Sequence, residues 1–367
     1  LAGVRPLALL ALCIGAAPLT EAARAQSTQL QNTGVWWSSY YDEAQGGDDF
    51  AYDVAIDGAY RLVTAGRIQP PGPATAGRYL AHSTVFTSAG LTDWSVTLGV
   101  ADADAGFWGV GIDAADNIVL AGYGGFDATV RKYPAAGPIL VWEAVWPGTA
   151  STPQSIQELA IGTDGAIHLA NNSTNGFFGG WSEWALLRLD AQGSRTLGPV
   201  NYNTPQPDVA YAIAVDDSDG SFVAAGIVGT ASAANDDWHV RKYDAAGSLL
   251  WSDTFSGAAG LHDYATGVAI DAAGDVYICG YTNRGTDNDA GQDFDWLVIK
   301  YARDGDGGAG RRLWTYTYAS APGRNETCRQ LALLPDGNVL VAGRIVDDEE
   351  RIRPRVALID ASTGSQL

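Results

Sequence analysis

The stretch Lys242–Thr282 reads KYDAAGSLLWSDTFSGAAGLHDYATGVAIDAAGDVYICGYT and contains every part of a unit that recurs along the chain. Runs of four to eight residues that alternate apolar and polar side chains are separated by turns rich in Gly and Asp. Such runs predict short antiparallel strands joined by hairpins, because successive side chains of a strand point to opposite faces. Repetition at a fixed period indicates the architecture before any single residue is considered.

The innermost apolar run of the unit occurs six times. Its copies begin at Val54, Val110, Leu159, Ile213, Val268 and Leu331. Each copy continues with a turn, a second run that contains Gly or Asn, a third run and, in most copies, a fourth run that carries Trp. Four antiparallel strands per copy, at a spacing of 49 to 63 residues, predict an all-β fold: a six-bladed β-propeller of four-stranded blades. A solenoid is the alternative, and the two ends of the repeat array argue against it.

The last copy stops at Leu367, where its fourth strand should begin. At the other end of the array, Trp37 precedes Val54 by the same seventeen residues that separate Trp314 from Leu331. We therefore expect Gly34–Tyr41 to supply the outer strand of the last blade and to close the ring, which removes a free sheet edge. This arrangement predicts a single propeller domain over residues 26–367.

A family resemblance rests on these repeats. The pattern D-x-A-x-x-V-A-I-D-x-x-G-D-V-Y-x-x-G, followed by D-W-x-V-x-K-Y-D-x-x-G-x-L-W, resembles the bacterial secreted β-propeller repeat family called SBBP. The resemblance covers about residues 35–367, and the third copy departs from it with Gly162 for Asp and Asn171 for Gly. The closing stretch VALIDASTGSQL is similar to the repeats of pyrroloquinoline-quinone-type propellers. The family implies a propeller outside the cell and brings no catalytic residues.

The composition and the first residues bear on location and partners. With 42 acidic and 22 basic residues the net charge is −20, which disfavours nucleic acid and anionic lipid as partners. An apolar run at Leu7–Leu19, with Arg5 before it and Ala23-Arg24-Ala25 after it, predicts a signal peptide over residues 1–25. No later segment is apolar enough to be a transmembrane helix. We expect a monomer that is secreted, periplasmic or on the cell surface.

Most of the unusual residues fall on repeat positions. All three lysines, Lys132, Lys242 and Lys300, share one position, which predicts a structural ion pair or a solvated stem and not a nucleophile. Seven tryptophans share two positions and are expected to pack between blades: Trp37, Trp142, Trp251 and Trp314 at one, and Trp184, Trp238 and Trp296 at the other. Five are off the pattern and are expected to pack in the core or at an edge, or to stack on sugars: Trp36, Trp94, Trp108, Trp146 and Trp181.

No established catalytic arrangement is recognisable. The four histidines occupy unmatched repeat positions, and no metal-ligand spacing or nucleophile elbow is present. Cys279 and Cys328 fall in neighbouring copies, and their spacing leaves open whether they form a disulfide.

The long connections, between second and third strands and between blades, are expected on one face, where propellers usually carry function. Six residues at repeat positions there are predicted to bind a ligand: Asp49, Asp208, Asp263 and Glu326 at the entrance of the first strand, and Arg67 and Arg344 after the second-strand Gly. The arginines would hold a carboxylate or sulfate. The alternatives are carboxylates that accept backbone N–H bonds at a turn, and arginines that neutralise those acids.

A separate acidic stretch predicts a calcium site. Carboxylates at every second residue around a Gly, namely Asp287, Asp289, Asp293 and Asp295, are typical of a flexible Ca²⁺ loop. A solvated acidic turn is the alternative, and no cofactor is required.

Together these features predict a secreted, non-enzymatic binding or cell-surface interaction module with a carbohydrate or protein ligand on the long-loop face. The alternative is an extracytoplasmic enzyme that uses carboxylates of that face. It would be a polysaccharide-active hydrolase or lyase, or a quinone-dependent dehydrogenase.

Overall fold

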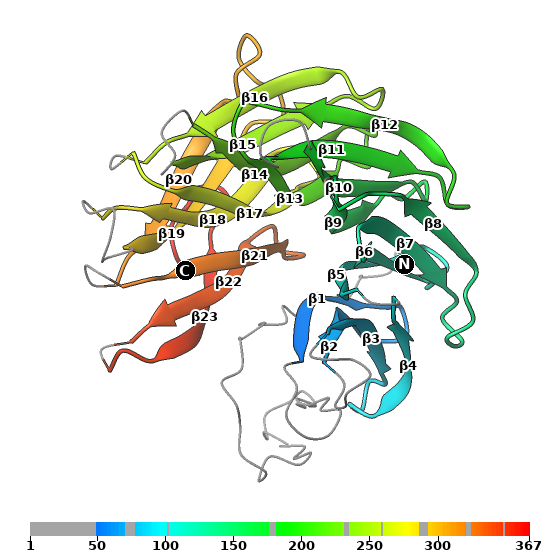
Figure 1. Cartoon of the computed structure of the whole chain (residues 1–367). Helices are drawn as coiled ribbons and strands as arrows, with labels where there is room; N and C mark the ends of the chain where they lie inside the picture. The colour runs from blue at the N-terminus through cyan, green and yellow to red at the C-terminus, as the bar shows by residue number, and fades with distance from the viewer. Residues whose placement is uncertain are drawn as a thin grey trace. The chain divides into compact units, whose positions relative to one another are not determined.

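The computed structural model describes residues 49–69, 78–100, 103–150, 152–175, 181–230, 235–257, 260–285, 293–320, 324–347 and 349–367. Over these residues it contains strands and no helix (Figure 1). The chain divides into two compact units at the bond between Ile156 and Gln157. We describe each unit by itself. None of the described segments is a helix that is both long and apolar enough to cross a membrane.

The first unit contains two four-stranded sheets. Each is a meander in which every strand pairs antiparallel with the next one in sequence. Their strands are β1 (Phe50–Ile56), β2 (Leu62–Ile68), β3 (Leu80–Phe86) and β4 (Thr92–Leu98), then β5 (Ala105–Ile112), β6 (Ile118–Gly124), β7 (Asp127–Tyr133) and β8 (Trp142–Trp146).

The second unit contains four sheets of the same order, and the first residues of its first strand precede the unit boundary. The first two sheets are β9 (Gln154–Ile161), β10 (Ile167–Asn175), β11 (Trp181–Leu189) and β12 (Arg195–Tyr202), then β13 (Asp208–Val215), β14 (Phe222–Gly229), β15 (Asp236–Tyr243) and β16 (Leu249–Phe255). The last two are β17 (Asp263–Ile270), β18 (Val276–Asn283), β19 (Phe294–Tyr301) and β20 (Arg312–Tyr318), then β21 (Thr327–Leu333), β22 (Val339–Val346) and β23 (Ile352–Ile359).

Six antiparallel meander sheets confirm the predicted fold class, an all-β propeller with six blades. Over the described residues the sixth blade has three strands. The strand expected at Gly34–Tyr41 lies outside the described residues, as does the signal peptide, so closure through the N-terminus and the single-domain boundary stay predictions.

A β-bulge near the start of the inner strand explains the Gly of the repeat. In β17 the pairing with β18 shifts between Ala265 and Gly267, so that the carbonyl of Tyr264 crowds the opposite strand. A Cβ at Gly280 would lie 1.9 Å from that carbonyl oxygen. Five glycines meet an inner-strand carbonyl in this way: Gly66, Gly122, Gly226, Gly280 and Gly343. Only a residue without a side chain fits there.

The cores lie between neighbouring sheets, as the repeated tryptophans predict. Trp238 packs with Ala265 and Val268 of the following blade, and Trp296 donates its indole N–H to the carbonyl of Arg344 at 3.1 Å. Fourth-strand tryptophans do the same, because Trp314 donates to the carbonyl of Ala361 at 2.9 Å. The predicted packing between blades is therefore confirmed for these described tryptophans.

Two tryptophans that the spacing placed off the pattern belong to it. Trp94 pairs with Val85 as Trp142 pairs with Lys132, so it occupies the same fourth-strand position. The spacing hides this because the connection to the next inner run is one residue shorter. Trp146 pairs with Ala128, in the place where other blades pair a third-strand Trp with a fourth-strand aromatic residue.

Candidate functional site

The acidic residues at the entrance of three inner strands, β13, β17 and β21, are fully buried. Asp208, Asp263 and Glu326 are each 0% exposed. Asp208 accepts hydrogen bonds from the backbone N–H of Thr204 at 2.5 Å and of Gly229 at 3.2 Å. The carboxylate of Asp208 therefore holds the connection that leads into β13, which is the arrangement of the structural alternative. A ligand would have to displace these backbone donors to reach Asp208.

Asp263 repeats the backbone hydrogen bonding of Asp208, whereas the hydrogen bond to Glu326 comes from a side chain. Asp263 accepts from the N–H of Gly257 at 2.6 Å, and Glu326 accepts from the hydroxyl of Ser320. Burial raises the pKa of Asp263 to about 6, against the effect of its backbone hydrogen bonds. In the first unit, partly buried Asp49 accepts from the N–H of Gln69 at 3.1 Å. Ligand binding by these carboxylates stays a prediction.

The acidic loop is only partly described. Asp287 and Asp289 lie outside the described residues. Asp295 forms an ion pair with Arg284, whose Nη2 lies 2.9 Å from its Oδ1. Burial raises the pKa of Asp295 to about 6, and Arg284 acts in the opposite direction. Within the described part of the chain, no three His, Cys, Asp or Glu side chains gather where they could hold a metal ion. The calcium loop stays a prediction.

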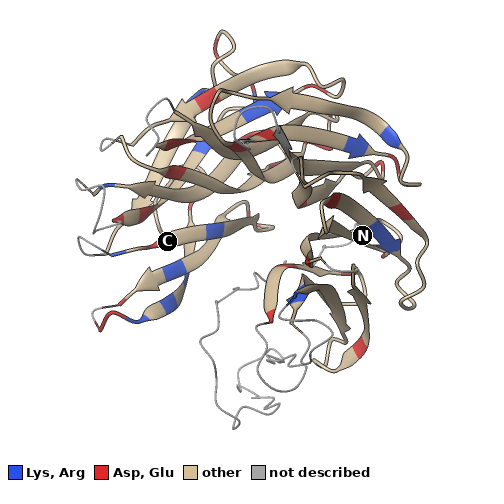
Figure 2. Cartoon of the chain, viewed as in Figure 1, with Lys and Arg blue, Asp and Glu red and all other residues tan. Residues whose placement is uncertain are grey.

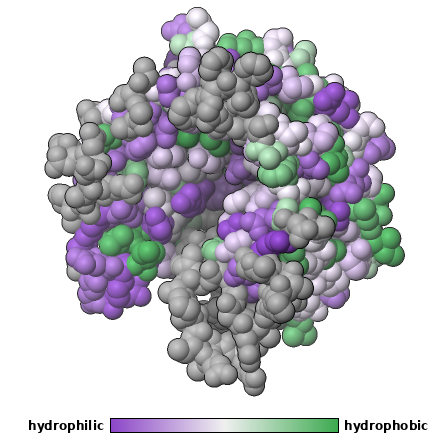
Figure 3. Space-filling view, in the orientation of Figure 1, coloured by the Kyte–Doolittle hydropathy of each residue, from purple (hydrophilic) through white to green (hydrophobic). Residues whose placement is uncertain are grey.

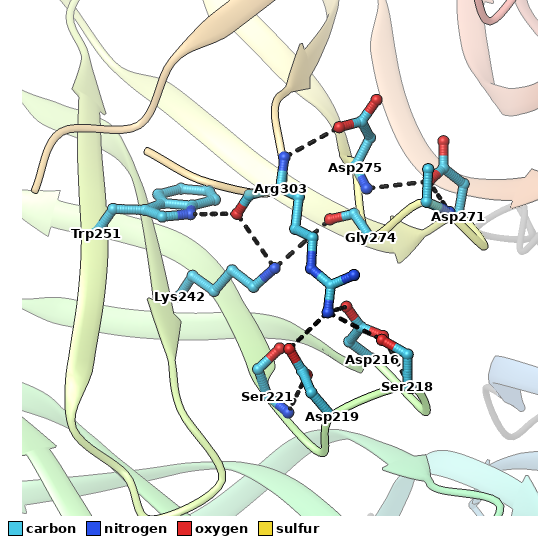
Figure 4. Close-up of polar contacts among 11 residues, drawn as sticks. Asp216, Ser218, Asp219, Ser221, Lys242, Trp251, Asp271, Gly274, Asp275 and Arg303 are labelled. Atoms are coloured by element: carbon cyan, nitrogen blue, oxygen red, sulfur yellow. Dashed lines mark hydrogen bonds and ion pairs between the residues drawn. The ribbon is translucent and has the colours of Figure 1, made fainter. Parts of the chain in front are cut away.

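The lysines are structural, as their shared position predicted. Lys132 pairs with Asp113 at 2.7 Å, and Lys300 pairs with Asp275 at 3.0 Å. The buried ammonium of Lys242 donates to two backbone carbonyls, that of Arg303 at 3.3 Å and that of Gly274 at 3.5 Å (Figure 4). Burial lowers the pKa of Lys242. Lys132 and Lys300 therefore hold the first hairpin of their own blade, whereas Lys242 holds the hairpins of the following blade.

The carbonyl that holds Lys242 belongs to a wider network at the hairpin ends (Figure 4). The same carbonyl of Arg303 accepts from the indole N–H of Trp251 at 3.0 Å. The guanidinium of Arg303 reaches Asp219 at 2.7 Å and Ser218 at 3.0 Å. This network joins the hairpins of neighbouring blades.

Cys279 and Cys328 are free thiols and both are buried. They contact each other between neighbouring blades, and burial raises the pKa of Cys279 well above its usual value. A thiol in this environment is a poor nucleophile.

One aromatic group of the second unit consists of residues that the repeat analysis did not single out; its Tyr211 and Tyr264 are partly exposed, whereas Tyr281 and Phe294 are buried. In the second unit, aromatic side chains gather at the start of β13 and β17 and at the end of β18. Tyr264 stacks on Tyr281 with ring centres 4.9 Å apart, and Tyr211 lies 6.5 Å from Tyr264. Phe294 meets Tyr281 edge-on at 5.0 Å, and the guanidinium of Arg329 lies 5.7 Å from the ring of Tyr281. We call these five residues the Tyr264 cluster.

The Tyr264 cluster carries an acid and an imidazole on one side. The hydroxyl of Tyr264 donates to Asp236 Oδ2 at 3.3 Å, and His262 Nδ1 lies 3.1 Å from the same oxygen. Burial and the charge of Asp236 raise the pKa of Tyr264. Burial likewise raises the pKa of Tyr211 to about 12. Both phenols therefore stay protonated and can donate hydrogen bonds at neutral pH.

Two exposed arginines of the sixth blade lie at the Tyr264 cluster, Arg329 as a member and Arg344 beside it. Arg329 lies on β21, and Arg344 on β22 donates from Nε to the hydroxyl of Thr327 at 3.1 Å. Basic residues lie along β21, β22 and β23 (Figure 2). Among the residues that the structure describes, neither Arg329 nor Arg344 forms an ion pair with an acidic side chain. Burial raises the pKa of Tyr281, while both arginines act in the opposite direction.

A similar group lies in the first unit. The guanidinium carbon of Arg67 is 3.8 Å from the ring centre of Tyr79 and 4.9 Å from that of Phe50. It is 5.6 Å from the ring of Tyr52 and 5.9 Å from the ring of Trp108. We call these residues the Arg67 cluster. Of the six predicted ligand-binding residues, Arg67 and Arg344 are therefore the two that stand among aromatic rings or at their border.

A sequence signal for these groups exists. Tyr52, Trp108, Tyr211 and Arg329 each stand two residues before an inner apolar run, where the strand pairing shifts. The bulge turns that residue away from the regular alternation. Aromatic or Arg side chains at the bulge position of several blades are the sequence pattern that indicates these groups. On the face shown in Figure 3, hydrophobic residues lie in separate small groups.

Comparison with known proteins supports the fold. Residues 257–285 match the SBBP family model, which is described as a beta-propeller repeat. The resemblance to this family is thereby confirmed over that stretch, whereas the similarity of the last repeat to quinone-type propellers stays a prediction. No curated protein matches the sequence.

Solved structures with similar folds are distant in sequence. A protein of unknown function from Dyadobacter fermentans is 11% identical with a TM-score of 0.54, over 84% of this chain and 94% of its own. An ulvan lyase is 10% identical with a TM-score of 0.58, over 86% of this chain and 79% of its own. The ulvan lyase bound to -[GlcA(1-4)Rha3S]- gives the same identity and TM-score, over 91% and 85%. At these identities the likeness concerns the fold alone.

Proposed function

We propose that this chain is a secreted carbohydrate-binding β-propeller without catalytic activity, and that its ligand lies against the Tyr264 cluster. The observation that carries the proposal is the group of stacked tyrosines beside Arg329 and Arg344, two exposed arginines without acidic partners among the described residues. The partly exposed rings of Tyr211 and Tyr264 offer flat apolar surface with little entropy to lose, and their hydroxyls add hydrogen bonds.

The arginines extend the proposal to acidic sugars. A guanidinium without a carboxylate partner binds carboxylate or sulfate through two parallel N–H bonds. With a net charge of −20, the chain as a whole repels anions, so that such a ligand needs local positive charge. An ulvan lyase with this fold has been solved with a unit of glucuronate and sulfated rhamnose bound, which supports a carbohydrate as the ligand class.

The experiment is a glycan array with the full chain, followed by calorimetric titration of the best ligand. Arg329→Gln should weaken binding about tenfold or more, because one charged hydrogen-bonded contact contributes about 1.5–3 kcal/mol. Tyr264→Ala should weaken it similarly through the loss of stacking. Tyr60→Ala is the matched control, since Tyr60 is 60% exposed on a hairpin outside both clusters.

Melting curves must first show that the variants fold. Arg329 is exposed, so its variant keeps the test informative if Tyr264→Ala unfolds. The proposal fails if the chain binds no glycan on the array, or if Arg329→Gln and Tyr264→Ala bind as the unaltered chain does.

A second candidate function, polysaccharide cleavage, is favoured by one observation. Tyr264, Asp236 and His262 form a hydrogen-bonded group beside the same arginines. A protonated phenol can serve as a general acid and an imidazole as a general base, with Arg329 holding the substrate carboxylate. Incubation with mixed acidic polysaccharides, assayed for reducing ends and for unsaturated sugar products, tests this candidate. Turnover that Tyr264→Phe abolishes would replace the non-enzymatic proposal.

A further inference from the structure

The Arg67 cluster differs from the other arginine sites of the first unit. Arg61 pairs with Asp57 at 2.7 Å and Arg131 pairs with Glu143 at 2.7 Å. Arg67, by contrast, has no ion pair with any described residue, although it is partly buried. A cation removed from water without an anion is costly unless something else compensates it.

Aromatic rings compensate Arg67 in part. Four rings lie within cation–π distance, and they contact each other: Tyr52 and Trp108 have ring centres 4.0 Å apart, and Phe50 and Tyr79 5.9 Å apart. Such contacts use the electron-rich faces of the rings and contribute about 0.5–2 kcal/mol each. They do not supply a hydrogen-bond acceptor to the N–H groups of the guanidinium.

Two N–H donors of the cluster are left without an acceptor. Within the described part of the chain, the Nε of Arg67 and the indole Nε1 of Trp108 are shielded from water and have no hydrogen-bond partner. An unsatisfied buried donor costs about 1–3 kcal/mol, so native proteins usually supply an acceptor from the chain, water or a ligand. Two such donors on adjacent side chains, one of them charged, indicate a place for an anionic oxygen group.

The neighbouring acids do not fill this place. Asp104 accepts from the N–H of Tyr79 at 2.9 Å, and Asp53 accepts from the N–H of Val110 at 2.8 Å. The other carboxylate oxygen of Asp53 accepts from the N–H of Val54 at 2.7 Å, so both of its oxygens are already hydrogen-bonded to backbone. The side chain of Arg67 is hydrogen-bonded to the hydroxyl of Tyr123, which opposes the effect of burial on the pKa of Tyr123. Among the described residues this bond still leaves the Nε of Arg67 without an acceptor.

We infer that the Arg67 cluster is a second ligand site, for the carboxylate or sulfate of an acidic sugar, separate from the Tyr264 cluster. The N–H groups of Arg67 and Trp108 bind the anionic oxygens, and the surrounding rings pack on the sugar ring. This inference extends the proposed carbohydrate-binding function, but it rests on residues of the first unit alone. It predicts two independent sites in each chain.

Fluorine NMR reads the site directly. The full chain is labelled with 5-fluorotryptophan, and Trp108→Phe identifies the Trp108 resonance. Glucuronate and glucose 6-sulfate are the probes, and glucose with sodium chloride at equal ionic strength is the neutral control. We expect a saturable shift of the Trp108 resonance with one or both acidic sugars, and a response to glucose at least about tenfold weaker in affinity.

Variants then show which residues cause the shift of the Trp108 resonance. Arg67→Gln should abolish the shift, whereas Arg195→Gln, which removes an equal charge at the exposed first residue of β12, should leave it unchanged. Arg329→Gln should also leave it unchanged. The inference is overturned if the acidic sugars do not shift the Trp108 resonance, if glucose shifts it equally, or if Arg67→Gln responds as the parent chain does.

The two proposals fail in different ways. Loss of all glycan-array binding in Arg329→Gln, together with a silent Trp108 resonance, would leave the Tyr264 cluster as the binding site and remove the Arg67 cluster. A Trp108 response that Arg67→Gln abolishes, in a chain whose array binding ignores Arg329 and Tyr264, would do the reverse.

Discussion

Two buried histidines have pKa values far below the usual range for this side chain. Burial lowers the pKa of His239 to about 3 and that of His168 to about 4, with a nearby arginine adding to each effect. His239 stacks on Tyr202 at 4.8 Å and hydrogen-bonds to the hydroxyl of Thr254 at 2.9 Å. Both imidazoles are therefore neutral in the folded chain at physiological pH.

This difference predicts a pH-dependent loss of stability. Below pH 6.5 the unfolded chain binds protons at His239 that the folded chain does not bind, so the free energy of unfolding falls as the pH falls. Comparing His239→Gln with the unaltered chain by urea denaturation isolates the effect. The stability advantage of His239 should shrink by about 2 kcal/mol between pH 8 and pH 5.

The stability of the variant must be compared with that of the unaltered chain, because buried aspartates change the pH dependence of the free energy of unfolding in the opposite direction. Asp53 and Asp263, with pKa values raised to about 6, hold their protons longer in the folded chain. They therefore stabilise the fold increasingly as the pH falls from about 6 towards 3.8. Thr254→Val serves as the control, since it removes a partner of His239 and no titrating group. An advantage of His239 that stays constant with pH would contradict the prediction.

At the scale of the strand, the bulge in the inner strand governs both stability and the ligand surfaces. It brings the carbonyl of one residue against the second strand, where Gly is needed, and it turns the next residues out of the regular alternation. The second strand, such as β14 or β18, therefore requires Gly opposite the bulge. The bulge position of the inner strand, such as β13 or β17, accepts different side chains.

Gly226→Ala should be severely destabilising. Its Cβ would lie 1.9 Å from the carbonyl oxygen of Val209 and 3.0 Å from the Cα of Ala210, and backbone atoms cannot swing aside. We expect a loss of about 3 kcal/mol or more in the free energy of unfolding.

Gly99→Ala is the control for this variant. Its nearest neighbour would be Leu80 Cδ2 at 3.4 Å, an ordinary contact at the end of a flexible side chain. We expect a change within about 1 kcal/mol. Similar melting temperatures for the two variants would show that the bulge relaxes, and that the Gly of the repeat has another cause.

For the whole molecule, the open question is how the sixth blade ends. β21, β22 and β23 form three strands, and every complete blade adds a fourth that carries an aromatic residue beside the third. In the fifth blade, Trp314 of that fourth strand donates to the hairpin of the next blade at Ala361. The spacing of Trp37 predicts that Gly34–Tyr41 completes the sixth blade.

Deleting Gly34–Tyr41 should therefore cause aggregation or a markedly lower melting temperature. It would expose the N–H and C=O groups of an unpaired strand and remove buried aromatic surface, each aromatic side chain contributing about 1.5–3 kcal/mol. Against a domain stability of about 5–15 kcal/mol this is a large loss. Deleting only Gln26–Gln31 should leave the melting temperature nearly unchanged. Equal melting of the two truncations would rule out closure through this segment.

The repeat was readable from the sequence because it depends on local, periodic properties. Alternation of apolar residues and turn chemistry recur in all six copies, and the positions of Gly280, Lys242 and Trp251 recur in several, so the copies reinforce one another. The same logic correctly assigned the lysines to structural roles. It misplaced Trp94, because one missing residue in a connection shifts the count without changing the strand pairing.

The proposed ligand surfaces depend on tertiary structure. Tyr211, Tyr264 and Arg329 come from three inner strands, and Asp236 meets His262 across 26 residues, so no local pattern brings them together. The bulge also turns one side chain out of the strand alternation, which periodicity arguments assume to be regular. Conversely, the acids at Asp208 and Asp263, which position alone placed at the ligand face, are buried by the connections that fold over them. Sequence determines which residues the repeat requires, whereas contacts between blades determine which of the remaining side chains meet.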